Sequence, residues 1–133
     1  MILLFEGGRK NMGVRLIQIS VVYFAIGVSL GMYMSMAHDY ALTGVHVHIN
    51  LLGWASFALA GIVYHLFPTI SKNIFAKLHF WSANIGIPLM MIGLTVLILA
   101  AADQATIFVA IGGFLVVFSV IMFAINVLKN VKA

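Results

Sequence analysis

Residues 106–128 read TIFVAIGGFLVVFSVIMFAINVL, a continuous apolar stretch without a charged side chain. An α-helix needs about 20 such residues to cross the hydrocarbon core of a bilayer. Three further stretches of this kind occupy residues 16–37, 47–67 and 78–101. The sequence therefore predicts an all-α fold, a bundle of four transmembrane helices that occupies residues 1–133 as a single integral membrane domain.

The composition agrees with a protein that crosses the membrane several times. Hydrophobic residues make up 64% of the 133 residues, charged residues make up 8%, and cysteine is absent. The lack of cysteine excludes disulfides, thiolate zinc sites, iron–sulfur clusters and covalently attached haem. A haem bound by this chain would have to be held by histidine or methionine.

The basic residues all fall on one side of the predicted bundle. They precede the first stretch, separate the second from the third, or follow the fourth: Arg9, Lys10, Arg15, Lys72, Lys77, Lys129 and Lys132. The other two connections carry Asp39 and Asp103. By the positive-inside rule we expect a multi-pass protein of the inner (cytoplasmic) membrane with both termini cytoplasmic. The net charge of +4 then reflects topology, and no nucleic-acid partner is expected.

Small residues mark points at which the predicted helices can approach closely. Gly27 and Gly31 have the spacing of a small-xxx-small motif in the first stretch, and Gly112 and Gly113 lie in the fourth. In a bilayer such residues allow helix backbones to pack tightly against each other.

Four ionisable side chains, His38, Asp39, His46 and His48, gather at the outer (periplasmic) edge of the second stretch. Ionisable groups in or near lipid are costly and indicate a functional site by default. Imidazoles in apolar surroundings are axial ligands of haem iron. His46 and His48 would point about 200° apart on an undistorted helix, so they cannot both bind one metal ion. Each could serve a different haem, or one could bind iron while the other pairs elsewhere.

A bis-histidine haem is difficult to build within one chain. His65 lies ~28 Å from His46 along the same predicted helix, and His79 lies near the basic end of the next one. The second axial ligand would most easily come from another subunit, which predicts a homo-oligomer. His65 and His79 flank one connection and are secondary candidates for a second haem or a proton relay. The interpretation that we prefer is that they are hydrogen-bonded polar residues at helix ends.

The order His38-Asp39 followed by His46-Val47-His48 resembles the outer end of the tenth helix in subunit I of the haem–copper oxidase and nitric oxide reductase family. The resemblance implies that His46 binds a high-spin haem and that His48 binds a low-spin haem. It also implies that His38 and Asp39 lie in the region of the haem propionates.

Neighbouring residues extend this resemblance. The stretch Asn50-Leu51-Leu52-Gly53-Trp54 looks closest to the C-type oxidases and nitric oxide reductases, which implies that Asn50 and Trp54 belong to the haem surroundings. Residues 78–81, Leu-His-Phe-Trp, resemble the opening of the family's next helix. The chain therefore looks like helices nine to twelve of subunit I, one four-helix arc standing alone.

The family's copper ligands and the second ligand of its low-spin haem have no counterpart here. The resemblance thus implies copies assembled as a trimer that mimics three arcs, or as a dimer, with haem b shared between subunits. We expect electron transfer through this haem, with a quinol or an electron-transfer protein as a partner. The alternatives are binding or reduction of oxygen or nitric oxide at an open haem site, and a non-catalytic accessory or assembly subunit of a respiratory oxidase. The sequence identifies no catalytic residue and leaves open whether the protein is an enzyme.

Overall fold

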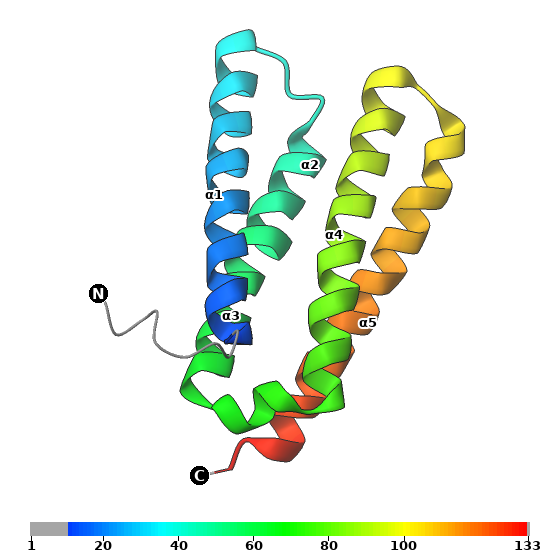
Figure 1. Ribbon diagram of the computed structural model, residues 1–133. Helices are drawn as coiled ribbons and strands as arrows, with labels where there is room; N and C mark the ends of the chain where they lie inside the picture. The colour runs from blue at the N-terminus through cyan, green and yellow to red at the C-terminus, as the bar shows by residue number, and fades with distance from the viewer. Residues whose placement is uncertain (1–10, 133) are drawn as a thin grey trace.

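The computed structural model describes residues 11–132, and its regular elements within that range are all helical (Figure 1). In chain order they are α1 (Met12–Ala37), α2 (Thr43–His48), the π-helix η2 (Ile49–Ser56), α3 (Phe57–Leu66), the 3₁₀-helix η3 (Pro68–Lys72), α4 (Ile74–Ala100), the 3₁₀-helix η4 (Asp103–Ala105) and α5 (Thr106–Asn130). The segments α2, η2 and α3 follow one another without a break and form the second span.

Four helical stretches are long and apolar enough to cross a membrane, which confirms the all-α fold with four helices of the predicted length and character. They are Met12–Ala37, Thr43–Leu66, Ile74–Ala100 and Asp103–Asn130. Each begins a few residues before the predicted apolar stretch. Asparagine caps explain two of these early starts, because Asn11 Oδ1 accepts a hydrogen bond from the Gly13 N–H at 2.9 Å and Asn73 Oδ1 accepts one from the Ala76 N–H at 3.0 Å.

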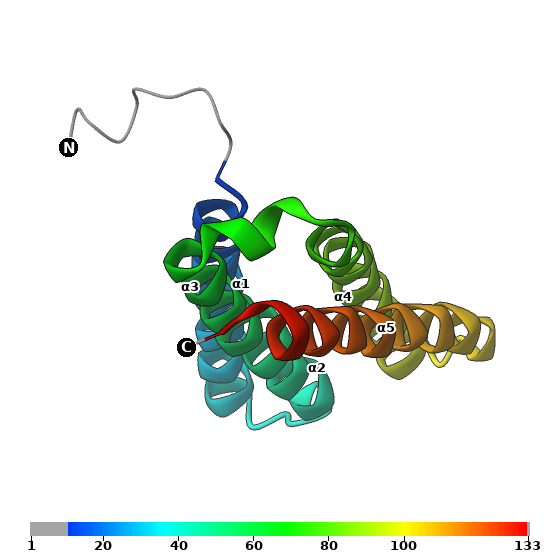
Figure 2. The same ribbon diagram turned by 90° about the horizontal axis from the view of Figure 1, so that it is seen from below.

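The spans form two antiparallel hairpins (Figures 1 and 2). In the first hairpin α1 packs along the second span, and in the second hairpin α4 packs along α5. The 3₁₀-helix η3 connects the hairpins at the end where α1 begins and α5 ends. We call this the basic end, because it carries the described basic residues Arg15, Lys72, Lys77, Lys129 and Lys132. Arg9 and Lys10 lie outside the described residues.

The opposite end, which we call the histidine end, contains the turn from α1 into α2 and the turn at η4 (Figure 1). His38, His46 and His48 all belong to it. The chain therefore separates its described lysines and arginines from this group of histidines by the length of a span.

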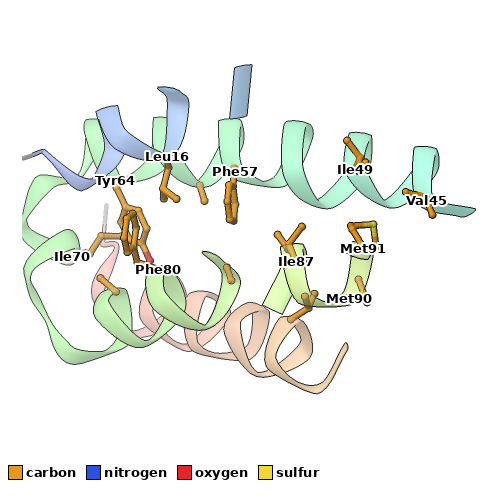
Figure 3. Close-up of a cluster of buried hydrophobic side chains, with 14 residues drawn as sticks. Leu16, Val45, Ile49, Phe57, Tyr64, Ile70, Phe80, Ile87, Met90 and Met91 are labelled. Carbon is orange, nitrogen blue, oxygen red and sulfur yellow. The ribbon is translucent and has the colours of Figure 1, made fainter. Parts of the chain in front are cut away.

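Buried apolar side chains join the two hairpins. In Figure 3, the second span contributes Val45, Ile49 and Phe57 to this cluster, and α4 contributes Ile87 and Met91. Lipid tails are as apolar as these side chains, so tight packing rather than exclusion of water favours this contact.

Glycines bring α4 and α5 together in the second hairpin. A Cβ atom built on Gly112 would lie 2.5 Å from the backbone nitrogen of Met90 and 2.8 Å from the carbonyl oxygen of Gly86. A Cβ atom on Gly113 would meet only the sulfur of Met90, at 3.7 Å. Gly112 is thus the close-approach position, whereas its neighbour leaves room for a side chain.

Gly112→Ala is expected to destabilise the protein by roughly 1–3 kcal/mol, because the added methyl group meets backbone that cannot yield cheaply. The matched control Gly113→Ala should change stability by no more than about 0.5 kcal/mol. Circular dichroism during unfolding of micelle-embedded protein by sodium dodecyl sulfate measures both effects. Equal losses in the two variants would contradict the proposed packing.

Candidate functional site

The turn between α1 and α2 is shaped by His38 and Asp39. His38 ends α1 with φ 50° and ψ 32°, in the left-handed region, and its N–H bonds to the carbonyl groups at the end of the helix. Asp39 Oδ1 accepts a hydrogen bond from the Ala41 N–H at 3.0 Å. Histidine and aspartate are both enriched in such conformations and turns. Both side chains are exposed, and both residues have a local role in directing the chain into α2.

His46 points from α2 into the contact with α1. Its Nδ1 donates a hydrogen bond to the carbonyl oxygen of Gly27 at 2.8 Å. A Cβ atom on Gly31 would lie 2.8 Å from Cε1 of the same ring. Gly31 therefore leaves the space that the half-buried imidazole occupies, and Gly27 leaves space for the amide of Asn50. At both predicted close-approach positions, a side chain of the second span rather than its backbone fills the space.

The hydrogen bond to Gly27 fixes the tautomer of His46. A carbonyl oxygen can only accept, so Nδ1 carries the proton and Nε2 of the neutral ring keeps its lone pair. The amide of Asn50 then has no acceptor at Nδ1, and its Nδ2 donates instead to the main-chain oxygen of His46 at 2.8 Å. Asn50 thus lies beside His46, with its amide against Gly27.

His48 has the same tautomer but a different environment. Its Nδ1 donates to the carbonyl oxygen of Gly44, one turn earlier in the same helix, at 2.7 Å. The side chain is exposed on the outside of the bundle. Metal-bound histidines almost always donate their second ring N–H to a carbonyl or carboxylate, so this arrangement prepares Nε2 to act as a ligand.

The two histidines therefore diverge, as helical geometry predicts. His46 faces α1 of its own chain, whereas His48 faces outward. The structure brings His46 and Asn50 together and keeps His48 apart from both. Within residues 11–132, no three His, Cys, Asp or Glu side chains lie close enough to hold one metal ion.

The π-helix η2 begins directly after His48 and was not predicted from the sequence. The hydroxyl of Ser56 donates to the carbonyl oxygen of Leu51, five residues earlier, at 2.7 Å. The ring of Tyr23 on α1 lies where a side chain at Gly53 would stand. π-Helical turns are rare in proteins as a whole, but those that occur are often found at functional sites. The glycine inside the apolar stretch is the one sequence signal that could have indicated an irregular helix.

Trp54 lies in the π-helix and packs toward α1. Its ring stacks on Phe24, with centroids 4.5 Å apart and planes inclined by 28°. This aromatic pair belongs to the contact between α1 and the second span, on the side that also holds His46.

The secondary candidates His65 and His79 do not form a shared site in this chain. His65 is exposed on α3, whereas His79 is buried on α4 with 5% of its surface accessible. Nδ1 of His79 and the hydroxyl of the buried Tyr64 share a hydrogen bond of 2.9 Å. Phe123 packs against the imidazole, with ring centroids 5.0 Å apart. His79 is therefore a hydrogen-bonded core residue at the basic end.

A second polar cluster at the basic end was not predicted. Asn126 is fully buried on α5, and its Nδ2 donates to the Ile70 carbonyl oxygen at 2.9 Å. Its Oδ1 accepts from Asn73 at 2.6 Å and from Asn130 at 2.9 Å. These bonds hold η3 and the start of α4 against α5. The only sequence signal is an asparagine inside an otherwise apolar stretch.

The geometry thus leaves Nε2 of His46 and Nε2 of His48 suited to binding a metal. His48 is exposed, whereas His46 is half-buried. Comparison of the chain with protein-family models, with curated proteins and with solved structures finds no match.

Tyr64→Phe is expected to destabilise the protein by about 1–3 kcal/mol, because it leaves Nδ1 of the buried His79 without a partner. Tyr33→Phe is the matched control, since Tyr33 is 61% exposed on α1. We expect the control to change stability by no more than about 0.5 kcal/mol. Detergent unfolding curves of the two variants provide the comparison, and a tolerated Tyr64→Phe would mean that this hydrogen bond contributes little.

Proposed function

We propose that this chain is a haem b protein of the inner membrane that transfers electrons, with His48 as an axial ligand of the iron at the interface of a homo-oligomer. The observation that carries the proposal is the hydrogen bond from Nδ1 of His48 to the Gly44 carbonyl oxygen, at 2.7 Å on an exposed helix face. This bond leaves the Nε2 lone pair free and holds the ring in one orientation.

The surroundings of His48 fit a large planar ligand. Gly44 has no side chain one turn away, and a Cβ atom there would meet only a methyl group of Leu94, at 3.8 Å. The next residues on the exposed surface of the second span include Val47 and Leu51, which are 40% and 60% exposed. Apolar neighbours of this kind would exclude water from a bound porphyrin. His46 fits less well, because its ring lies against α1 at Gly31.

Each residue would have a separate task in such a site. Haem iron supplies one-electron chemistry by changing between its ferrous and ferric states. His48 would hold the iron through Nε2, and the Gly44 carbonyl would fix the ring and increase its basicity. His46 would hold α1 against α2 through Gly27, as a positioning residue rather than as a first choice of ligand.

The second axial ligand would come from another copy of the chain. His46 turns inward, and His65 and His79 belong to the other end of the bundle. Exposed apolar side chains continue along the second span from His48 at Leu51, Leu59 and Ile62, which gives copies a surface on which to associate. A trimer would correspond to the three arcs of subunit I in the haem–copper oxidase family, and a dimer would follow the commonest symmetry.

The proposed relationship to one arc of that subunit rests on the sequence order of His38, Asp39, His46 and His48 and on residues 78–81. The proposed orientation, with cytoplasmic termini and a periplasmic histidine end, rests on the location of the lysines and arginines. A quinol or an electron-transfer protein would then supply or accept the electron. The proposal assigns no copper chemistry to the chain.

A second candidate function is the binding of oxygen or nitric oxide at a haem with an open coordination position. It is favoured by the inward orientation of His46, since of the two helical histidines at the histidine end His48 alone then presents an exposed side chain, while His38 belongs to the turn after α1. Iron held by a single histidine leaves a position at which a diatomic gas can bind.

The test is the absorption spectrum of detergent-purified protein, oxidised and reduced with dithionite, together with haem per chain and oligomeric mass. Sharp reduced bands that carbon monoxide does not shift indicate two histidine ligands and electron transfer. Bands that shift indicate the gas-binding alternative. Absence of haem after expression with ample haem overturns both and favours an accessory subunit, and a monomer with full haem content excludes the shared ligand.

His48→Ala is expected to lower the affinity for haem by at least roughly 10–100-fold. Loss of a residue that only hydrogen-bonds to a metal ligand has an effect of this size, and loss of the ligand itself should cost no less. His65→Ala is the control, because His65 is also exposed but lies at the basic end. Titration of the apoproteins with haem gives the two affinities. An unchanged haem content and spectrum in His48→Ala would falsify the assignment of His48.

A further inference from the structure

An open groove lies between α1 and α4 at the basic end, where helices of the two hairpins face each other. Its volume is about 540 Å³, and its walls include Arg15, Gln18 and Val22 of α1 and Phe80, Trp81 and Asn84 of α4. Val22 and Trp81 are 57% and 62% exposed, so the groove opens on the outside of the bundle. No side chain of the proposed haem site contributes to it.

Polarity changes in order along this groove. Arg15 lies on the first turn of α1, Gln18 lies one turn further in, and Val22 follows after another turn. The distance from Arg15 to Val22 along the helix axis is roughly 10 Å. A ligand lying in the groove would therefore meet a cation first, an amide next and an apolar wall last.

The cation in this groove has no acidic partner within residues 11–132. The acidic side chains of that range, Asp39 and Asp103, lie at the histidine end, a full span away. Arg15 is half-buried in the groove wall. A half-buried guanidinium favours an anion that it can bind through two parallel hydrogen bonds, as a phosphate allows.

The amides and aromatic rings complete the pattern. Asn84 Nδ2 already donates one of its two hydrogens to the Phe80 carbonyl oxygen at 2.8 Å, so the exposed amide of Gln18 is the more available donor for the ligand. Trp81 stands edge-on to Phe80, with ring centroids 5.5 Å apart, and presents a broad apolar surface. Indole rings are favoured at the boundary between headgroups and acyl chains.

We propose that this groove is a binding site for one anionic phospholipid, whose phosphate binds Arg15, whose ester carbonyl accepts from Gln18 and whose acyl chain lies along Val22, Phe80 and Trp81. Basic pockets between transmembrane helices on the cytoplasmic side bind such headgroups. The occupant is an amphiphile rather than a free anion, because the cationic end of the groove continues directly into an apolar wall. The bound lipid would fill the space between the hairpins where α1 and α4 face each other.

The chain contains a natural reporter for this site, since Trp81 lines the groove and Trp54 is the only other tryptophan. In a Trp54→Phe background, the protein is reconstituted into two kinds of vesicle with the same mixture of phosphatidylglycerol and phosphatidylcholine. Bromine atoms that quench tryptophan are carried by the phosphatidylglycerol in one and by an equal mole fraction of phosphatidylcholine in the other. The two vesicles have equal charge and equal quencher density, so any difference in quenching reports which lipid contacts Trp81.

Greater quenching by the brominated phosphatidylglycerol is expected. Arg15→Gln should reduce the relative affinity for the anionic lipid about fivefold, which is the effect of one basic residue near the surface. Arg15→Lys should retain only part of it, because an ammonium keeps the charge but cannot form the two parallel hydrogen bonds of a guanidinium. Lys129→Gln, which removes an exposed cation at the same end on α5, should retain all of it. Together, these results would establish the site.

Equal quenching in the two vesicles would overturn the proposal, as would a preference that survives Arg15→Gln or disappears in Lys129→Gln. Inorganic phosphate added at excess distinguishes the two sources of the anion. A preference that persists in its presence supports an amphiphile held by both its headgroup and its acyl chain. A preference that is abolished shows that a phosphate group alone accounts for the selectivity, and overturns the part assigned to the apolar wall.

Discussion

The close contact between α1 and the second span at Gly27 and Gly31 determines the direction of both outer histidines. In a bilayer, where association depends on packing, two missing side chains let an imidazole and an amide fit between helix backbones. The ring of His46 fills the space at Gly31 and the amide of Asn50 fills the space at Gly27, while Nδ1 of His46 donates to the Gly27 carbonyl oxygen at 2.8 Å. Because His46 is turned toward α1, His48, two residues later, must face the other way. The outward orientation of His48 is thus a consequence of an inward-facing packing contact.

The two ends of the bundle use polar side chains for different purposes. At the basic end Tyr64, His79, Asn73 and Asn126 bond to one another or to the main chain. In residues 11–132, no buried side-chain nitrogen or oxygen is left without a hydrogen-bond partner. At the histidine end the ring nitrogens are only half used, since Nδ1 of His46 and of His48 bonds to a carbonyl oxygen while Nε2 does not. The hydrogen-bonded polar groups of the basic end hold the helices in place, whereas each Nε2 atom at the histidine end keeps a lone pair that can accept a proton or bind a metal.

Much of the fold could be predicted because it depends on properties of single stretches. Apolar length identifies the four spans, and helical periodicity separates the directions of His46 and His48. The pairing of Tyr64 with His79 and the cluster around Asn126 could not be predicted, since they join residues that are far apart in the sequence. The π-helix was not predicted either, and the contact of Tyr23 with Gly53 inside it also joins residues of different helices. The role of the histidines as ligands stays a prediction from chemistry and resemblance.

The π-helix η2 separates the second span into two parts, α2 and α3. Side chains of these parts need not point in the directions that one continuous α-helix would give them. Ile49–Ser56 lies between the histidines and the segment that carries Tyr64. A wide turn corresponds to about one residue more than an α-helix would use, so it offsets the two faces by roughly 100°. The face of the second span that carries His48 can therefore be oriented independently of the face through which Tyr64 bonds to His79 on α4. Insertion or loss of a single residue would thus suffice to turn the side chains at the histidine end without rebuilding the core around Tyr64.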